Sequence, residues 1–428
     1  KIKGYIEEEI KIDKNKLRSE VLFTEYGIDS VISIQLINKL EQEFGILPKT
    51  LFFEYPTIEK VAEYFYEKHA NKCMEIFNHK NDITGEQIAN NKYLIPRIKT
   101  KEDKKIDMNV NTDIAIVGVA GRYPKSKNLT ELWDNLKEGV DMVGEIPPER
   151  WDYRRFYSSE KGIPGKSYCK WGAFMDDADK FDPLFFGIPP MEAEFIDPQE
   201  RIFLQTSWDA MEDAGYAHVN CQNKKVGVFV GVMYGLYQLY SVTRDGNKMY
   251  GSSSYASVAN RVSYFLNLKG PSIAVDTMCS SSLTAIHLAC NSIILGECDM
   301  AIAGGVNIAS HYQKYIQLCQ NNFLSSDGKC RSFGEGGDGY VPGEGTGAVV
   351  LKKLENAVAD GDYIYGVIKG SAINSGGKTS GFTVPDSAAQ AEVIEEALKR
   401  ANVNPATIGY IEAHGTGTAL GIQLKSRV

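Results

Sequence analysis

From Asp113 onward, short apolar runs alternate with longer amphipathic stretches, and this alternation restricts the fold more than any other feature of the chain. The apolar runs are DIAIVGVAG, KVGVFVGV, PSIAVDT, MAIAGGVNIA, GAVVLK and YIYGVIKGSAIN. Such runs are typical of strands that are buried on both faces of a sheet. Stretches between them, such as PQERIFLQTSWDAMEDAG and SLTAIHLACNSIILG, have helical spacing. We therefore expect an α/β fold in this part of the chain.

The first 69 residues have a different pattern, which predicts a small all-α helix bundle. Apolar side chains recur there at helical spacing, at Ile32, Leu36, Leu40 and Phe44 and again at Ile58, Val61, Ala62 and Phe65. Residues 70–110 are rich in Asn, Lys and Asp and cannot bury enough apolar surface to fold by themselves. The expected domains are a helical unit over 1–69, a flexible linker over 70–110 and an α/β domain over 111–428.

Composition excludes several classes of function. A net charge of -8 argues against nucleic-acid binding, which needs an excess of Lys and Arg. No stretch approaches the roughly 18 apolar residues of a membrane helix, and the charged start KIKGYIEEEI does not resemble a secretory signal. The eight cysteines include no CxxC pair, which suits free thiols and predicts no metal site. We expect a cytoplasmic protein without a membrane or nucleic-acid partner.

Cys279 is the strongest candidate for a catalytic residue. In GPSIAVDTMCSSSLTAIHLA an apolar strand turns directly into a helix, with Cys279 at the turn. The N-terminal end of a helix stabilises a thiolate, which makes such a cysteine a nucleophile near neutral pH. Most cysteines are instead small buried apolar residues, and we expect this of Cys290, Cys298 and Cys319.

His414 is the second candidate. It stands in IEAHGTGTALG, where it is expected to follow a short apolar strand and to open a loop of alternating Gly and Thr. A histidine can donate a hydrogen bond to a developing oxyanion or act as an acid or base. His287 falls inside a predicted helix and is expected to be structural, whereas His218 and His311 belong to no motif.

Ser30 stands at the start of a predicted helix, in the segment FTEYGIDSVISIQLINKLEQEFG. Asp29 or Ser30 could be an ordinary helix cap, and capping alone favours that interpretation. The segment nevertheless resembles the attachment motif of acyl and peptidyl carrier domains, and the resemblance covers residues 1–69. It implies that Ser30 carries 4′-phosphopantetheine, which a phosphopantetheinyl transferase attaches and which holds an acyl group as a thioester.

Residues Asp113–Gly421 resemble the β-ketoacyl synthase family, and more closely the ketosynthases of modular polyketide synthases. DTMCSSSL is similar to the nucleophile motif, with Met278 where a small residue is more usual, and EAHGTGT is similar to the first histidine motif. Further similar segments are FGIPPMEAEFIDPQERIFLQTSWDAMEDAGY, ANRVSYFLNLKGPS and CRSFGEGGDGYVPGEGTGAVVLK. The resemblance implies a thiolase-like layered α/β fold with two related halves, which works as a homodimer.

The resemblance also implies a mechanism. Cys279 would accept an acyl chain from a carrier thioester, and a malonyl thioester would then lose carbon dioxide and attack the acyl group. His414 would stabilise the enolate oxygen formed by that loss. The segments GIDSV, VPGEG and PDSAAQ resemble synthases whose acyltransferase is a separate protein.

The chain departs from the family pattern after HGTGT. The family continues there with a Gly-Asp-Pro helix start, a catalytic lysine and a second histidine, whereas this sequence reads GIQLKSRV. We expect a ketosynthase domain that is incomplete at its C-terminus, as a fragment of a working synthase, and no carbon–carbon bond formation by residues 1–428 alone. The alternatives are a remnant in which only the carrier functions, a domain that transfers acyl groups without condensing them, and a fatty-acid-type elongation synthase.

Overall fold

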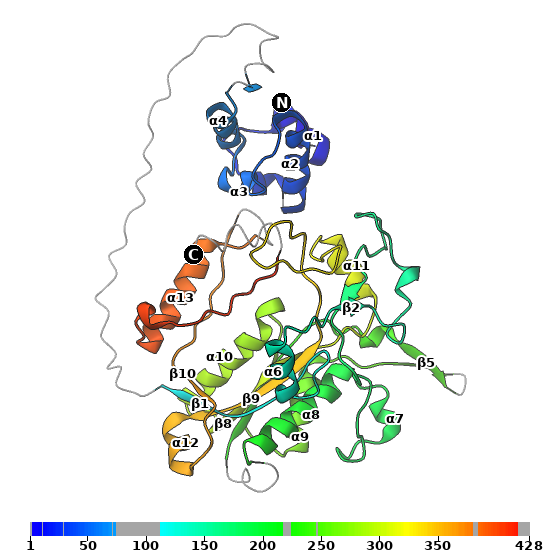
Figure 1. Cartoon of the computed structure of the whole chain (residues 1–428), viewed down its shortest axis with the longest axis vertical. Helices are drawn as coiled ribbons and strands as arrows, with labels where there is room; N and C mark the ends of the chain where they lie inside the picture. Colours follow the sequence, from blue (N-terminus) through cyan, green and yellow to red (C-terminus); the bar gives the residue numbers. More distant parts are fainter. Residues whose placement is uncertain are drawn as a thin grey trace. The chain divides into compact units, whose positions relative to one another are not determined.

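The computed structural model describes residues 2–10, 12–28, 30–70, 72–73, 112–216, 224–244, 247–379 and 384–417. The chain divides into two units, a small helical one within residues 1–111 and a larger α/β one that begins at Thr112 (Figure 1). Each unit has a hydrophobic core of its own. The predicted linker, residues 70–110, lies almost entirely outside the described residues, and so do residues 418–428.

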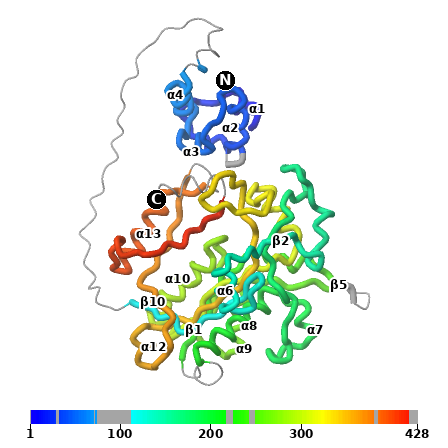
Figure 2. The backbone as a smooth tube through the Cα atoms, viewed as in Figure 1, coloured from blue at the N-terminus to red at the C-terminus, as the bar shows by residue number. Residues whose placement is uncertain are grey.

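The small unit is a bundle of helices around one apolar core, as predicted. Its elements are α1 (Ile2–Ile10), α2 (Ser30–Phe44), α3 (Leu51–Glu54) and α4 (Ile58–Lys68), with 3-10 turns at Lys14–Lys16 and Phe23–Tyr26. Figure 2 shows the backbone of the chain as a tube, in which these helices are the blue part labelled α1 to α4. Leu36 and Val61 are fully buried, whereas Ala62, which the pattern assigns to the core, is exposed. Tyr64, two residues further along α4, is buried instead, and its ring packs against that of Tyr55.

The large unit is built on one six-stranded mixed sheet. In spatial order its strands are β10 (Gly366–Ile368), β1 (Ile114–Arg122), β9 (Gly345–Lys353), β8 (Met300–Asn307), β4 (Val226–Val232) and β7 (Ser272–Val275). β4 is parallel to β7 and β8, whereas β9 is antiparallel to β8 and β1, and β1 to β10. Each of the six strands overlaps the apolar run that predicts it, and only β1 and β9 extend one or two residues beyond their runs.

Helices cover both faces of this sheet (Figure 1). α8 (Pro198–Asp213) and α9 (Tyr255–Phe265) pack on one face, against Val228 and its neighbours, and α10 (Ser281–Ile294) packs on the other, against Phe229 and Ala301. Successive residues of a strand point to opposite faces. Since both faces are covered, both sets of residues are apolar, which explains the uninterrupted apolar runs.

Shorter elements complete the large unit. They are α6 (Leu129–Lys137), α7 (Pro190–Ala193), α11 (Gln313–Gln320), α12 (Leu354–Asp360) and α13 (Ser387–Ala401), the strand pairs β2 with β3 (Gly144–Glu145, Trp171–Gly172) and β5 with β6 (Ser241–Arg244, Asn247–Tyr250), and 3-10 turns at Tyr153–Arg155, Tyr237–Leu239, Met278–Ser280 and Pro405–Thr407. In the part of the chain that the structure describes, no helix has the length and apolar character needed to cross a membrane.

One predicted strand is wrong. The segment that precedes His414 is irregular over residues 408–417, and Tyr410 and Ile411 are each 78% exposed. An apolar run becomes a strand only where a neighbouring strand pairs with its backbone N–H and C=O groups. Among the described residues, none of the sheets includes this segment or a second large layer beside the six strands.

A buried carboxylate, Glu344, joins three separate segments of the large unit. Its Oε1 accepts a hydrogen bond from the backbone N–H of Ala309 (2.8 Å), and its Oε2 accepts one from the backbone N–H of Met175 (2.9 Å). Arg150 forms an ion pair of 2.7 Å with Oε2. Burial raises the pKa of Glu344, and the charge of Arg150 opposes that shift. The charged form of the Glu344 carboxylate is therefore stabilised by all three donors.

Replacing Glu344 by Gln is expected to lower the free energy of unfolding of the large unit by about 3 kcal/mol, because Arg150 loses its partner charge and one acceptor becomes a donor. The four tryptophans of the chain all lie in this unit, so their fluorescence during urea unfolding reports on it alone. The matched control is Asp134→Asn, which removes an exposed ion pair with Lys137 and should leave the midpoint nearly unchanged. Equal midpoints for the two variants would show that Glu344 does not join these segments.

Candidate active site

Cys279 lies in the turn that joins β7 to α10, as the sequence predicts. The 3-10 turn that contains it leads directly into α10, and the Cys279 side chain is exposed. Met278, just before it, has a left-handed backbone conformation with a φ of 58°. The Ser281 hydroxyl accepts a hydrogen bond from the N–H of Thr277 (2.9 Å) and donates one to the carbonyl of Met278 (2.6 Å). One side chain thus fixes the turn that presents the thiol.

Two glycines of the sheet determine how closely this turn approaches it. A Cβ built on Gly231 of β4 would lie 2.5 Å from the backbone of Ser281 and Ser282. A Cβ on Gly305 of β8 would lie 2.9 Å from the Cβ of Ser282. Real Cβ atoms essentially never come within 3.0 Å of such neighbours. The N-terminal end of α10 therefore rests on glycine backbone, and this contact positions Cys279.

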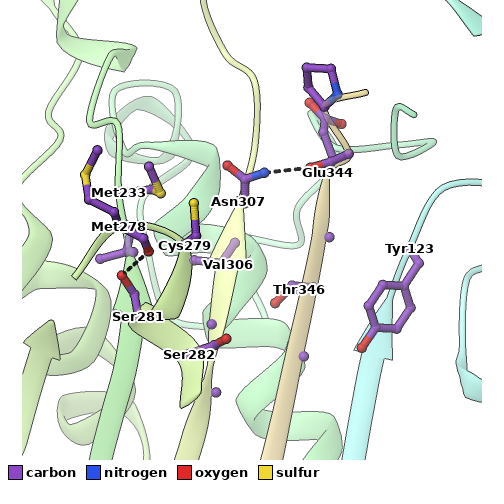
Figure 3. A pocket seen from close by; sticks show the side chains of 18 of the residues that line it. Tyr123, Met233, Met278, Cys279, Ser281, Ser282, Val306, Asn307, Glu344 and Thr346 are labelled. Atoms are coloured by element: carbon purple, nitrogen blue, oxygen red, sulfur yellow. Dashed lines mark hydrogen bonds between the residues drawn. The ribbon is translucent and has the colours of Figure 1, made fainter. Parts of the chain in front are cut away.

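Cys279 and His414 line the same cavity, whose volume is about 830 Å³. Figure 3 shows Cys279 in the turn before α10, with Met233, Met278 and Asn307 near it. Much of the wall is apolar or glycine, with Val119, Leu129, Ile286, Val306 and Leu318 among the lining residues. A cavity of this size and character suits a small molecule or a short hydrocarbon chain. The structure thus brings together the two residues that the motifs select, although they are far apart in the sequence.

His414 reaches the cavity from an irregular segment. It is exposed, and the segment is held by its next residue, Gly415. The Gly415 carbonyl accepts a hydrogen bond from the Ser332 hydroxyl and a weaker one from the Cys330 thiol (3.6 Å). Cys330 lines the cavity as well. The loop of residues 330–332 therefore holds the His414 segment at the edge of the cavity.

Two tyrosines, Tyr234 and Tyr340, line the cavity together with the nucleophile. Burial raises the pKa of Tyr234 and of Tyr340, and in both cases the negative charge of a Cys279 thiolate adds to the shift. Such a charge changes the pKa of a group only when it is near. Both phenols therefore stay protonated beside the thiol, where each can donate a hydrogen bond. No sequence motif selects them, although Tyr234 follows the end of β4 with one residue between.

Lys314 of α11 also lines the cavity, although no sequence motif selects it. It is 4% exposed, its Nζ donates a hydrogen bond to Oδ1 of Asn307 (2.5 Å), and Nζ lies 5.1 Å from the centre of the Tyr234 ring. Burial lowers the pKa of Lys314 to about 8, and the charges of Glu344 and Asp197 oppose that shift. A lysine within a helical pattern gives no signal of such burial, although Tyr315, Leu318 and Cys319 of the same helix are buried.

Ser30 is the first residue of α2, but its side chain and the whole of Asp29 lie outside the described part of the structure. Gly27, with a φ of 75°, ends the preceding 3-10 turn and redirects the chain toward the helix. Ile28 and Ser33, on either side of Ser30, are buried. The predicted position of Ser30 at the N-terminal end of a helix is confirmed.

The other histidines have structural surroundings or lie outside the described residues. His287 is buried in α10, where its ring nitrogens form hydrogen bonds with Ser371 (2.8 Å) and Asn291 (2.9 Å), and burial lowers its pKa. His311 is also buried. His218 lies outside the described part of the chain.

The burial predicted for three of the other cysteines is confirmed. Cys290, Cys298 and Cys319 are buried, and burial raises the pKa of each. A raised pKa lowers the fraction of reactive thiolate. Cys279, in contrast, is open to the cavity.

Three family models match this chain. The model for the β-ketoacyl synthase N-terminal domain matches residues 111–357, and the one for the β-ketoacyl synthase C-terminal domain matches residues 365–423. The model for the phosphopantetheine attachment site matches residues 1–65. The chain therefore belongs to the β-ketoacyl synthase family, and its first part is a domain of the kind that carries covalent 4′-phosphopantetheine.

Individual relatives narrow this class to polyketide synthases. Polyketide synthase PksL of Bacillus subtilis (strain 168) is 49% identical over 435 residues, which cover 96% of this chain and 10% of PksL. Polyketide synthase ThaG of Burkholderia thailandensis is 46% identical, over 96% of this chain and 8% of ThaG. The chain thus spans 10% or less of the length of these relatives. The predicted resemblance to a carrier domain followed by a polyketide ketosynthase is confirmed.

Solved structures support the fold of the large unit. The oxazolomycin ketosynthase domain OzmH KS7 of Streptomyces albus aligns with a TM-score of 0.71 at 57% identity, over 73% of this chain and 54% of that one. The ketosynthase from module 6 of the bacillaene synthase of Bacillus subtilis 168 aligns with a TM-score of 0.68 at 45% identity, over 73% and 53%. The large unit therefore has the thiolase-like α/β fold of ketosynthases.

Proposed function

We propose that this chain is a segment of a polyketide assembly line, in which a carrier domain is followed by a ketosynthase domain. The observation that carries the proposal is the meeting of Cys279 and His414 at one cavity. The substrates would be acyl chains and malonyl units held as thioesters on carrier domains. A cytoplasmic location belongs to the proposal, since the seven cysteines of the described residues are all free thiols.

In the first step, the Cys279 thiolate attacks the carbonyl carbon of an acyl thioester held on an upstream carrier. A bond from the Cys279 sulfur to that carbon forms, the bond from the carbon to the carrier sulfur breaks, and the released carrier thiolate takes up a proton. Backbone N–H groups of the turn, including that of Cys279, are the proposed donors to the oxyanion. In other acyl-transfer enzymes one such donor is worth about 3 to 4 kcal/mol.

In the second step, a malonyl thioester on a carrier loses carbon dioxide and leaves an enolate. His414 donates a hydrogen bond to the enolate oxygen, which lowers the energy of that intermediate. The α-carbon of the enolate then attacks the acyl carbonyl on Cys279. In a whole synthase, a carbon–carbon bond then forms, and Cys279 leaves as a thiolate.

Ser30 is the proposed attachment point of 4′-phosphopantetheine. It begins α2, a helix of 15 residues, and the N-terminal end of a helix favours a bound phosphate. The attached cofactor supplies a thiol that holds an acyl group as a thioester. A phosphopantetheinyl transferase would install it, and a separate acyltransferase would supply malonyl groups, as the motifs VPGEG and PDSAAQ favour.

A homodimer through the outer edge of β7 is also part of the proposal. In the described part of the sheet, β7 pairs with β4 on one side only. Apolar side chains are exposed beside that edge, with Tyr264 at 87%, Leu283 at 71% and Ile273 at 39%. Proteins usually cover such an edge, because free strand edges and apolar patches promote association. A second copy related by a two-fold axis would cover it with the identical surface.

Incubation of the chain with hexanoyl pantetheine is expected to place one acyl group on Cys279, detected by peptide mass spectrometry. Cys279→Ser should lower the rate by at least about 100-fold, because it removes the nucleophile. His414→Ala should keep this transfer but lose decarboxylation of a malonyl thioester, measured as released carbon dioxide. Acylation that persists in Cys279→Ser would refute the assignment of the nucleophile, and decarboxylation that persists in His414→Ala would refute the role of the histidine.

Treatment with coenzyme A and a phosphopantetheinyl transferase is expected to add one phosphopantetheine group to the chain. Ser30→Ala should abolish the added mass, because the hydroxyl that accepts the phosphate is gone. Ser19→Ala, in a turn of the same unit, is the matched control and should be modified like the unchanged protein. Modification of Ser30→Ala would place the attachment elsewhere.

The unchanged protein is expected to have twice the 47.4 kDa mass of one chain in size-exclusion chromatography with light scattering. Ile273→Lys combined with Leu283→Lys should reduce it to the mass of one chain, because the new charges would be buried without partners. Leu295→Lys, at the other end of α10 and 73% exposed, is the control and should remain a dimer. A monomeric unchanged protein would exclude this interface.

A further inference from the structure

We propose that Lys314 determines specificity: its amine donates a hydrogen bond to a hydroxyl or keto oxygen on the acyl chain held by Cys279, so that the cavity prefers oxygenated chains to saturated ones. This inference rests on the proposed function, because it takes Cys279 as the residue that carries the chain. It adds a class of substrate that neither the motifs nor the fold specifies.

The first support is an excess of donors on a buried amine. Lys314 is 4% exposed, and the structure gives its amine one hydrogen bond, to Asn307. An ammonium group has three N–H donors, and a neutral amine has two. Glu344 and Asp197 affect Lys314 through charge and not through a hydrogen bond. A buried donor without an acceptor destabilises a protein, so an oxygen brought by a ligand would offset that loss.

The second support is the place of the amine in the cavity. Lys314 is the only lysine or arginine among the described residues that line it. Its Nζ lies 5.1 Å from the centre of the Tyr234 ring, and the charge of the Cys279 thiolate acts on the phenol of the same tyrosine. Tyr234, Cys279 and Lys314 all line this one cavity. A chain that extends from Cys279 past Tyr234 comes within reach of Lys314.

The third support is that a hydrogen bond holds the amine in position while its other N–H groups stay available to a ligand. The amide of Asn307 donates a hydrogen bond to the carbonyl of Gly343 (2.6 Å), which orients its oxygen toward Lys314. Figure 3 shows Asn307 joined by this hydrogen bond to the segment that contains Glu344, just before β9. Both oxygens of Glu344 already accept hydrogen bonds from other residues. The arrangement fixes the amine and leaves its other donors for a ligand.

The chemistry explains why such a site would discriminate. A cavity with apolar walls distinguishes poorly between chains that differ by one methylene, whereas a buried group that must form a hydrogen bond strongly disfavours a chain without the matching oxygen. A hydroxyl or keto oxygen replaces the water that the amine loses on burial. A saturated chain of the same length leaves the amine without that acceptor.

The test compares pantetheine thioesters of hexanoate, 3-hydroxyhexanoate and 5-oxohexanoate as donors to Cys279 of the full chain. The unchanged protein is expected to prefer at least one oxygenated chain by about 10- to 100-fold in kcat/KM, the range of a hydrogen bond to a charged group. Lys314→Met should abolish the preference, mainly through a higher KM for the oxygenated chain. Lys314→Gln, which keeps an N–H donor, should restore part of it.

Two controls separate specificity from stability. Lys180→Met makes the same change at an exposed lysine and should keep the preference of the unchanged protein. Tryptophan fluorescence in urea establishes that each variant is folded. Two results would overturn the proposal. One is that folded Lys314→Met lowers kcat/KM equally for all three thioesters, and the other is that it keeps the preference for oxygenated chains.

A failure of the proposed function gives a different result. If no thioester acylates Cys279 of the unchanged protein, that function is refuted, and the preference is then measured by alkylation of Cys279 with N-hexyl and N-(5-hydroxyhexyl) chloroacetamide. This reaction needs only the thiol. Faster alkylation by the hydroxylated reagent that depends on Lys314 would support the inference, and equal rates would overturn it. Peptide mapping distinguishes Cys279 from Cys330, which lines the same cavity.

Discussion

The contact between the N-terminal end of α10 and the glycine backbone of β4 and β8 is the constraint on which the active-site architecture depends. At Gly231 and Gly305, a side chain would collide with Ser281 or Ser282 at the start of α10. The height of Cys279 above the sheet is therefore set by backbone contacts, which vary less than side-chain packing. The two apolar cores on either face hold the sheet itself in place.

The two proposed catalytic residues are held in different ways. Cys279 stands on a turn fixed by Ser281 at the centre of the fold, whereas His414 belongs to an irregular segment held through Gly415. A nucleophile must keep one geometry toward the carbonyl that it attacks. A hydrogen-bond donor on a separate segment can adjust to the enolate after the acyl chain is in place. The site thus combines a residue on a short turn between a strand and a helix with a residue on an irregular segment.

Much of this architecture follows from the sequence alone. The six strands and the turn at Cys279 were predictable, because buried strands have uninterrupted apolar runs and a strand that meets a helix leaves a short turn between them. The strand expected before His414 was not correct, because strand formation depends on a neighbour that sequence periodicity does not reveal. The burial of Lys314 was missed for a similar reason, since a lysine in a helical pattern looks exposed until tertiary packing encloses it. The cavity as a whole is likewise a product of segments distant in the sequence.

The glycine contact under α10 has a consequence for how such domains diversify. The glycine contact sets the position of the thiol, whereas other residues form the cavity walls. Substitutions on α11 or just after β4 can therefore change which acyl chain fits without moving the thiol. Under the proposed function, reactivity and selectivity therefore depend on different stretches of one polypeptide. A duplicated copy of this domain can keep its chemistry intact while it acquires a preference for the product of a new preceding step.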